Sequence, residues 1–283
     1  MGGRYFGAHV TSAGGLQKSA EAAQQLGINS IQVHPTPPQR WNSKPFAEGA
    51  EEAFNTVRKS AGVEKIFFHG IYLINLANPD DQKFHLSKVS LVNDLDFSSR
   101  INGDGVIFHM GSMKDQKDEA AGYERVAYGI NWILEHAKNN GRLILEVAAG
   151  SGAVIGDRLE ELAIVYEKVE QKDRVGFGLD TQHLWASGYD LQNKLEEIVK
   201  QIDSVLGLKK VWSVHLNDSM TALASRKDRH ANIGTGLIGK DALEKFLNHP
   251  KLKHIPFILE TPALKEMETA KAEVETLRAL VRE

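Results

Sequence analysis

A chain of 283 residues is long enough for one large α/β barrel or two small domains, and its 42% hydrophobic and 25% charged residues are typical of a globular protein. The net charge of −3 provides no general attraction to polyanions, and no apolar run approaches the ~20 residues of a transmembrane helix, which excludes a membrane span. The absence of cysteine excludes disulfides and thiolate metal sites, so His, Asp and Glu remain as candidate metal ligands. The first residues lack the pattern of a secretory signal, and we expect a cytoplasmic protein.

Eight short apolar runs rich in Val, Ile and Phe recur along the chain, and each has the near-continuous apolarity of a strand buried on both faces of a parallel sheet. In chain order, the predicted strands are 4–10, 29–35, 64–70, 105–111, 142–148, 175–181, 211–217 and 256–262. Helical periodicity lies between them, most clearly over 157–170 and 191–206. Because strands alternate with helices and no linker interrupts them, we predict the α/β class and a single (β/α)8 TIM barrel over 1–283. A doubly wound open sheet is the alternative.

A potential metal ligand stands at or next to the carboxyl end of every predicted strand. In chain order, these residues are His9, His34, His69, His109, Glu146, Asp180, His215 and Glu260. In a (β/α)8 barrel the strand ends converge on one face, where active sites are built. Buried together without a cation, so many acids and imidazoles would repel one another or stay unsatisfied. The sequence therefore predicts a multinuclear metal site at this face, with zinc favoured and manganese or iron as alternatives.

Two further stretches extend this set of ligands. His183 follows Asp180 by three residues, and Asp228 and His230 lie two positions apart within 225–236 (SRKDRHANIGTG). On an extended loop this spacing turns both side chains to the same side, so that they could form a three-ligand site with His183. The remaining histidines are predicted to be ordinary surface residues: His85, His136, His249 and His254.

Long segments of the chain resemble the endonuclease IV (deoxyribonuclease IV) family of apurinic/apyrimidinic (AP) endonucleases. They are GAHVTSAGGL (7–16), HGIYLINLANPD (69–80), GLDTQHLWASGYD (178–190), VHLNDS (214–219), SRKDRHANIGTGLIG (225–239) and FILETP (257–262). The resemblance implies a DNA-repair hydrolase that cleaves the phosphodiester 5′ to an AP site with three zinc ions, leaves a 3′-hydroxyl and trims blocked 3′ ends. It also implies a monomer that acts on double-stranded DNA, at the nucleoid if the organism is bacterial or archaeal.

The same resemblance implies a role for each ligand, residue by residue. The first zinc would be held by His69 and His109, with Glu146 bridging to the second. The second would be completed by Asp180, His215 and Glu260, and the third would be held by His183, Asp228 and His230. Mn²⁺ or Fe²⁺ is an alternative at one site. Glu146 and Glu260 would be the catalytic carboxylates, with Glu260 orienting or deprotonating the nucleophile.

DNA contacts are expected in loops around this face, because an abasic nucleotide must be extruded and the gap filled by side chains. The candidates are Gln39, Arg40, Trp41, Tyr72, Leu73, Arg226 and Arg229. Departures from the family pattern concern this DNA surface. They are three prolines in the loop after the second strand (Pro35, Pro37 and Pro38), His34 at a usually apolar position, and Met220 where Lys is usual.

Two other classes of function are open. A xylose-isomerase-like sugar isomerase or epimerase would use a one- or two-metal site formed by Glu146, Asp180, His215 and Glu260. A protein that binds damaged DNA without cutting it is the non-enzymatic alternative. Metal stoichiometry separates the two enzyme classes, with about three ions per chain expected for the nuclease and one or two for the isomerase.

Overall fold

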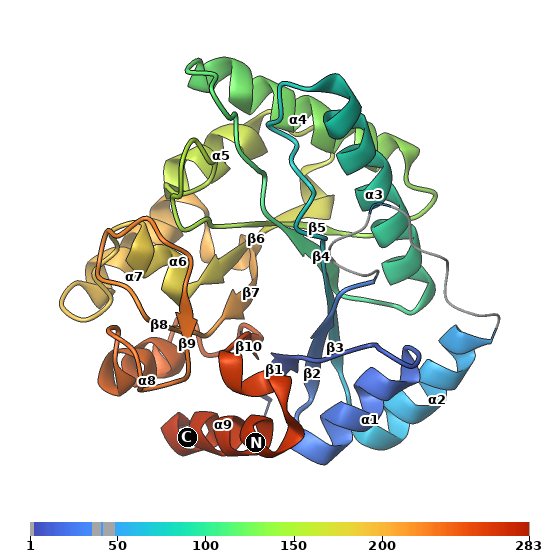
Figure 1. Cartoon of the computed structure of the whole chain (residues 1–283), viewed down its shortest axis with the longest axis vertical. Helices are drawn as coiled ribbons and strands as arrows, with labels where there is room; N and C mark the ends of the chain where they lie inside the picture. The colour runs from blue at the N-terminus through green and yellow to red at the C-terminus, as the bar shows by residue number, and fades with distance from the viewer. Residues whose placement is uncertain (1–2, 36–40, 42–48, 283) are drawn as a thin grey trace.

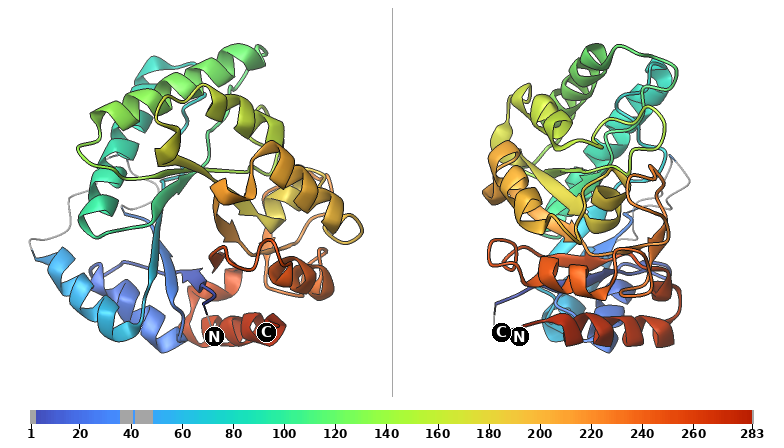
Figure 2. Two further views of the ribbon diagram at one scale, coloured as in Figure 1. Left: turned by 180° about the vertical axis from the view of Figure 1, so that it is seen from behind. Right: turned by 90° about the vertical axis from the view of Figure 1, so that its left-hand side faces the viewer.

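The computed structural model describes residues 3–35, 41 and 49–282, which form a closed barrel of parallel strands surrounded by helices (Figures 1 and 2). The barrel strands are β1 (Phe6–His9), β2 (Ser30–Val33), β3 (Lys65–His69), β4 (Gly105–Phe108), β5 (Leu143–Glu146), β6 (Val175–Asp180), β7 (Val211–His215) and β10 (Phe257–Leu259). Around the barrel they follow the order β1-β10-β7-β6-β5-β4-β3-β2. The predicted (β/α)8 barrel is confirmed, and the alternative of an open doubly wound sheet is wrong.

The helices form an outer ring around the strands (Figure 1). They are α1 (Gln17–Leu26), α2 (Ala50–Ala61), α3 (Asp81–Arg100), α4 (Glu119–His136), α5 (Leu159–Glu167), α6 (Thr181–Ala186), α7 (Leu195–Val205), α8 (Lys240–Asn248) and α9 (Met267–Leu280), with short 3-10 helices at Lys172–Arg174, Leu208–Lys210 and Pro262–Lys265. The predicted helical stretches contain α5 and α7. An additional two-stranded antiparallel sheet pairs β8 (Asp218–Ser219) with β9 (His230–Ala231). This small sheet positions His230 close to the end of β7.

The residues that point into the barrel form an apolar layer below a polar one. The apolar layer is a buried cluster of Phe67, Ile107, Ile144 and Ile258. Each member lies two residues before a predicted ligand, namely His69, His109, Glu146 and Glu260. Because successive side chains of a strand alternate between its faces, residues two apart point to the same side. The apolar layer therefore closes the barrel beneath the ligands, while intervening residues such as Phe68 and Phe108 pack outward in the larger core around the barrel.

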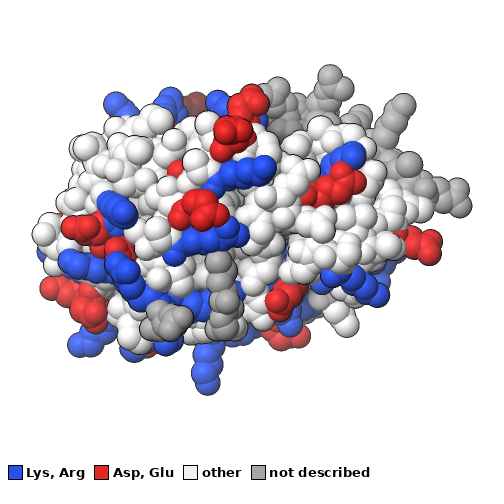
Figure 3. Space-filling model, turned by 90° about the horizontal axis from the view of Figure 1, so that it is seen from below, with Lys and Arg blue, Asp and Glu red and all other residues white. Residues whose placement is uncertain are grey.

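The outer surface carries charges of both signs. On the face shown in Figure 3, Lys and Arg side chains lie among Asp and Glu side chains rather than in a separate basic area. Within the described residues, no helix is long and apolar enough to cross a membrane.

One surface prediction is wrong. His249 is only 8% exposed. Its ring is buried because it follows the last residue of α8, where Nδ1 accepts a hydrogen bond from the backbone N–H of Lys251 (3.2 Å) and Nε2 faces Glu196 (3.4 Å). The other three residues of that group are exposed, as predicted: His85, His136 and His254.

Candidate metal centre

Glu146, the last residue of β5, lies at the centre of the polar layer and is fully buried. Its Oε2 is 3.1 Å from Nε2 of His69 and 3.4 Å from Nε2 of His109. Its Oε1 is 2.8 Å from Nδ1 of His215 and 3.3 Å from Nδ1 of His183. The two carboxylate oxygens therefore face different groups of imidazoles, which is the arrangement a carboxylate needs in order to bridge two cations.

A second group of donors surrounds the other side of Glu146. Glu146, Asp180, His215 and Glu260 offer one ligand atom each, and these atoms all lie within 4.8 Å of one another. Nδ1 of His215 is 3.3 Å from Oε2 of Glu260 and 3.8 Å from Oδ2 of Asp180. Cross-strand register produces this contact, since Asp180 on β6 pairs directly with His215 on β7.

A third group lies further out, beyond β6. Oδ2 of Asp180 is 3.9 Å from Nδ1 of His183 and 3.7 Å from Nε2 of His230. Asp228, whose side chain is half-exposed, reaches Nε2 of His183 with one oxygen (3.4 Å) and Nε2 of His230 with the other (3.3 Å). The structure thus brings the predicted trio of His183, Asp228 and His230 together, and it adds Asp180 as a donor that both imidazoles can share.

Hydrogen bonds to acceptors fix which nitrogen of most of these histidines faces the centre. The Nδ1–H groups of His69, His183 and His230 donate to the carbonyl oxygens of Gly70 (2.8 Å), Val147 (3.0 Å) and Glu260 (3.2 Å). A carbonyl oxygen only accepts, so in the neutral form of each ring, which is the form that binds a metal, Nε2 carries the lone pair and is directed at the cluster.

The donor set fits divalent metal ions. Three ring nitrogens are buried without a hydrogen-bond partner among the described residues: Nδ1 of His109, Nε2 of His183 and Nε2 of His230. Buried nitrogens of this kind cost free energy unless they bind something. A ligand set of imidazole nitrogens and carboxylate oxygens, with no thiolate, suits zinc, manganese or iron.

Electrostatic coupling inside the cluster keeps its carboxylates ionised. Burial alone would raise the pKa of Glu146, but His109 and His215, together with a hydrogen bond from His183, hold it well below its usual range. Burial alone would lower the pKa of His215, but Glu260 and Glu146 raise it to about 9. The ionised carboxylates are the form that binds cations.

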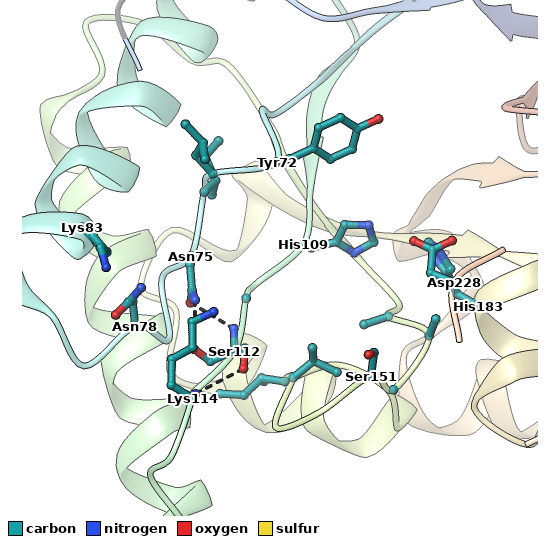
Figure 4. A pocket seen from close by; sticks show the side chains of 18 of the residues that line it. Tyr72, Asn75, Asn78, Lys83, His109, Ser112, Lys114, Ser151, His183 and Asp228 are labelled. Atoms are coloured by element: carbon teal, nitrogen blue, oxygen red, sulfur yellow. Dashed lines mark hydrogen bonds and ion pairs between the residues drawn. The ribbon is translucent and has the colours of Figure 1, made fainter. Parts of the chain in front are cut away.

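Two pockets open onto the cluster from different sides. The larger, of about 870 Å³, is lined by His69, His230 and Glu260 among others, and the smaller has a volume of about 470 Å³. They share part of their lining, namely Tyr72, His109, His183 and Asp228. In Figure 4 the imidazole of His109 points toward His183 and Asp228, whereas Asn78 and Lys83 lie at the far end of the smaller pocket. The two pockets therefore form a continuous opening that could accept an extended substrate.

The predicted DNA contacts are distributed unevenly around this opening. Tyr72 is 73% exposed and Leu73 is 37% exposed on the rim, directly after β3. Trp41 lines the smaller pocket, partly buried against the core. Gln39 and Arg40 lie outside the described residues, as do Pro37 and Pro38.

The two arginines of the predicted basic cluster differ in their contacts. Arg226 donates to the carbonyl of Gly150 (2.6 Å) and to Asp157 (2.7 Å), so its guanidinium holds two loops of the barrel together. Arg229 is exposed and donates only to the neighbouring carbonyl of Asp228 (2.7 Å) among the described contacts, which leaves it available for a ligand. Met220 is 59% exposed.

Three residues at or just after the ends of β1 and β2 lie together beside the metal centre: His9, His34 and Pro35. His34 donates from Nδ1 to the carbonyl of His69 (3.0 Å), and its ring lies 4.6 Å from that of His9 and 5.6 Å from that of Tyr72. Burial is the main cause that lowers the pKa of His34 to about 3, and His9 and His69 add to the effect, so the ring is neutral. His34, His9 and Pro35 all line the larger pocket.

Two fully buried amides were missed as parts of the site. Gln32 contacts His215, Glu260 and His9. Asn217 donates to Asp180 (2.7 Å) and accepts from the backbone N–H of Glu260 (2.9 Å). The sequence signal for Gln32 is a large polar side chain placed between two apolar residues of a strand, Ile31 and Val33.

The sequence matches the family described as "Xylose isomerase-like TIM barrel" over residues 20–280. It is 38% identical over 259 residues to a probable endonuclease 4 of Halothermothrix orenii, with 91% of this chain and 93% of that relative covered. A probable endonuclease 4 of Clostridium botulinum is 36% identical over 274 residues, with 97% and 98% of the two chains covered. Among solved structures, endonuclease IV from Thermus thermophilus has a TM-score of 0.88 and 31% identity, with 98% of each chain covered.

Proposed function

Because the chain belongs to the endonuclease IV family of xylose-isomerase-like TIM barrels, we propose that it is an endonuclease that hydrolyses DNA on the 5′ side of AP sites. The proposed product carries a 3′-hydroxyl, and the same centre would trim blocked 3′ ends. The family prediction is confirmed by these relatives, and with it the assignment to the hydrolases. The proposed substrate is double-stranded DNA, bound by a monomer in the cytoplasm, at the nucleoid if the organism is bacterial or archaeal.

The observation that carries this proposal is the number of donors that converge on one face. A four-donor group is sufficient for a sugar-processing enzyme of the same fold, and it is present as Glu146, Asp180, His215 and Glu260. Five additional ligands adjoin it: His69, His109, His183, Asp228 and His230. Charged donors at this density, most of them buried, are costly unless cations bind them.

The residues present fit three divalent ions, which we propose to be zinc. His69, His109 and Glu146 would hold the first, and Glu146 would bridge to a second that is completed by Asp180, His215 and Glu260. His183, Asp228 and His230 would hold the third. When bound, such ions supply Lewis acidity that activates water near neutral pH and neutralises charge on a phosphodiester.

The chain's own side chains supply the rest of the reaction. Water attacks phosphorus, the bond from phosphorus to the 3′ oxygen breaks, and that oxygen leaves with a proton as the 3′-hydroxyl. Glu260 lines the larger pocket and its side chain is 16% exposed, so it is the carboxylate placed to orient the water and accept its proton. Tyr72 and Leu73, exposed on the rim, would fill the gap left by an extruded abasic nucleotide.

A sugar isomerase or epimerase is the second candidate, because its four-donor group is complete, with Glu146, Asp180 and His215 buried and Glu260 partly exposed. It would need one or two ions and would leave the outer histidines without a function.

The test is incision of an end-labelled duplex that contains one AP site, with the same undamaged duplex as control and zinc content measured on the same preparation. We expect a single cut 5′ to the lesion, a product that a DNA polymerase extends, and about three zinc ions per chain. Protein that holds three ions but cuts neither duplex would contradict the proposed substrate. Protein that holds one or two ions and isomerises sugars would favour the second candidate.

A further inference from the structure

We infer that Gln32 is a positioning residue of the metal centre, which fixes the orientation and the tautomer of His215 and the orientation of Glu260. The inference rests on the metal centre proposed above. Gln32 lies on β2 and is fully buried. Two strands, β1 and β10, separate β2 from β7, which carries His215. None of the nine ligands of the proposed metal centre lies on β2.

Both the nitrogen and the oxygen of the Gln32 amide have partners in the centre. Its Oε1 lies 2.7 Å from Nε2 of His215. Its Nε2 donates to Oε1 of Glu260 and lies 2.9 Å from Nδ1 of His9. A carboxylate cannot donate, so the amide nitrogen must face Glu260 and the amide oxygen must face His215.

This amide orientation determines the protonation of His215. Because Oε1 of Gln32 only accepts, the proton of a neutral His215 ring must sit on Nε2. Nδ1 is then left with its lone pair, and it faces Glu146 (2.8 Å), Glu260 (3.3 Å) and Asp180 (3.8 Å). The same amide holds Glu260 through its Oε1, which leaves Oε2 on the side of His215.

The amide oxygen of Gln32 accepts a hydrogen bond from His215 in the same way that main-chain carbonyl oxygens accept hydrogen bonds from other histidine ligands. His69, His183 and His230 are oriented by main-chain carbonyl oxygens. A main-chain carbonyl oxygen remains present whatever residue carries it. The hydrogen bond to His215, in contrast, depends on the identity of residue 32. Partners of this kind typically contribute roughly 10–100-fold to metal affinity.

The test compares Gln32→Met with wild-type protein and with Ser30→Ala. Methionine keeps the length of the side chain and removes every hydrogen bond. Ser30 is on the same strand and two positions away, is fully buried, and its hydroxyl has no hydrogen-bond partner among the described residues, so it is a matched control. Zinc content after dialysis, zinc affinity by chelator competition, and the melting temperature with and without zinc are measured for all three proteins.

We expect Gln32→Met to lose about one of the bound zinc ions per chain, through roughly 10–100-fold weaker binding, and to retain the others. Its metal-free melting temperature should match that of wild type, while the rise on zinc addition becomes smaller. Ser30→Ala should bind zinc like wild type. A Gln32→Met protein whose metal-free form melts much lower, with zinc affinity unchanged, would show a purely structural role and overturn the inference.

A second variant covers the case in which Gln32→Met does not fold. Gln32→Asn keeps the amide but shortens the side chain by one methylene, which withdraws its oxygen from His215 and its nitrogen from Glu260, so weaker zinc binding is again expected. If zinc affinity is unchanged in Gln32→Asn while the wild type incises abasic DNA, the inference is overturned and the proposed function stands. Wild-type protein that binds no zinc would overturn both this inference and the proposed function.

Discussion

Tyr72→Ala should separate DNA recognition from folding and metal binding. The ring is 73% exposed and lies 5.6 Å from the ring of His34, so its removal leaves little cavity and should change the free energy of unfolding by no more than about 0.5 kcal/mol. Stacking of an aromatic side chain with a base contributes roughly 1–3 kcal/mol. Since about 1.4 kcal/mol is a factor of ten, kcat/KM on abasic duplex should fall roughly 5- to 150-fold.

The assay measures initial rates of incision on a duplex with one AP site, together with zinc content and melting temperature. Tyr128→Ala is the matched control, because Tyr128 is 60% exposed on α4 and lines neither pocket at the metal centre. It should leave kcat/KM unchanged. Equal rates for wild type and Tyr72→Ala would refute the gap-filling role, and a parallel loss of zinc would show that the substitution acts on the metal centre.

Three further outcomes are expected. Glu260→Gln should reduce incision at least about 100-fold and leave the metal-free melting temperature unchanged, and near wild-type incision would refute its assignment as ligand and base. Burial raises the pKa of Asp94 from 3.8 to about 8, so the folded state holds a proton that the unfolded state has lost, and stability falls as pH rises between these values. Urea unfolding should therefore show that Asp94→Asn is more stable than wild type, with a difference in the free energy of unfolding that grows from about pH 5 to about pH 7 and is at most about 4 kcal/mol. Equal stability of the two proteins at about pH 7 would contradict the raised pKa of Asp94. Arg226→Ala should lower the free energy of unfolding by about 1–2 kcal/mol, because it leaves the buried carboxylate of Asp157 unpaired, and unchanged urea unfolding would show the ion pair to be unimportant.

The positions of the proposed ligands could be predicted because they depend on local patterns. Each candidate at a strand end lies at the last residue of its strand or one residue after it, as with His69 on β3 and His109 after β4. Two-residue alternation turns these side chains inward, and parallel strands in a closed barrel bring their carboxyl ends together. Neither step requires knowledge of the contacts that each side chain makes.

Roles that depend on a particular partner could not be predicted. Arg226 is a predicted DNA contact, and nothing in the sequence indicates that its guanidinium also binds Asp157, which lies 69 positions earlier in the chain. His249 was expected on the surface, yet the turn after α8 buries it. In both cases the outcome depends on how a loop returns to the barrel, and loop paths leave no periodic signal in the sequence.

The barrel, the face that carries the site and the residue types gathered there can all be predicted from the sequence, because hydrophobic periodicity and strand ends are local properties. Which of these groups are in contact depends on the folded chain. Gln32 and His215 are separated by 183 positions and meet across the barrel through one hydrogen bond of 2.7 Å. This hydrogen bond depends on strand register, barrel closure and side-chain rotamers together, and none of these can be inferred from the residues near either partner.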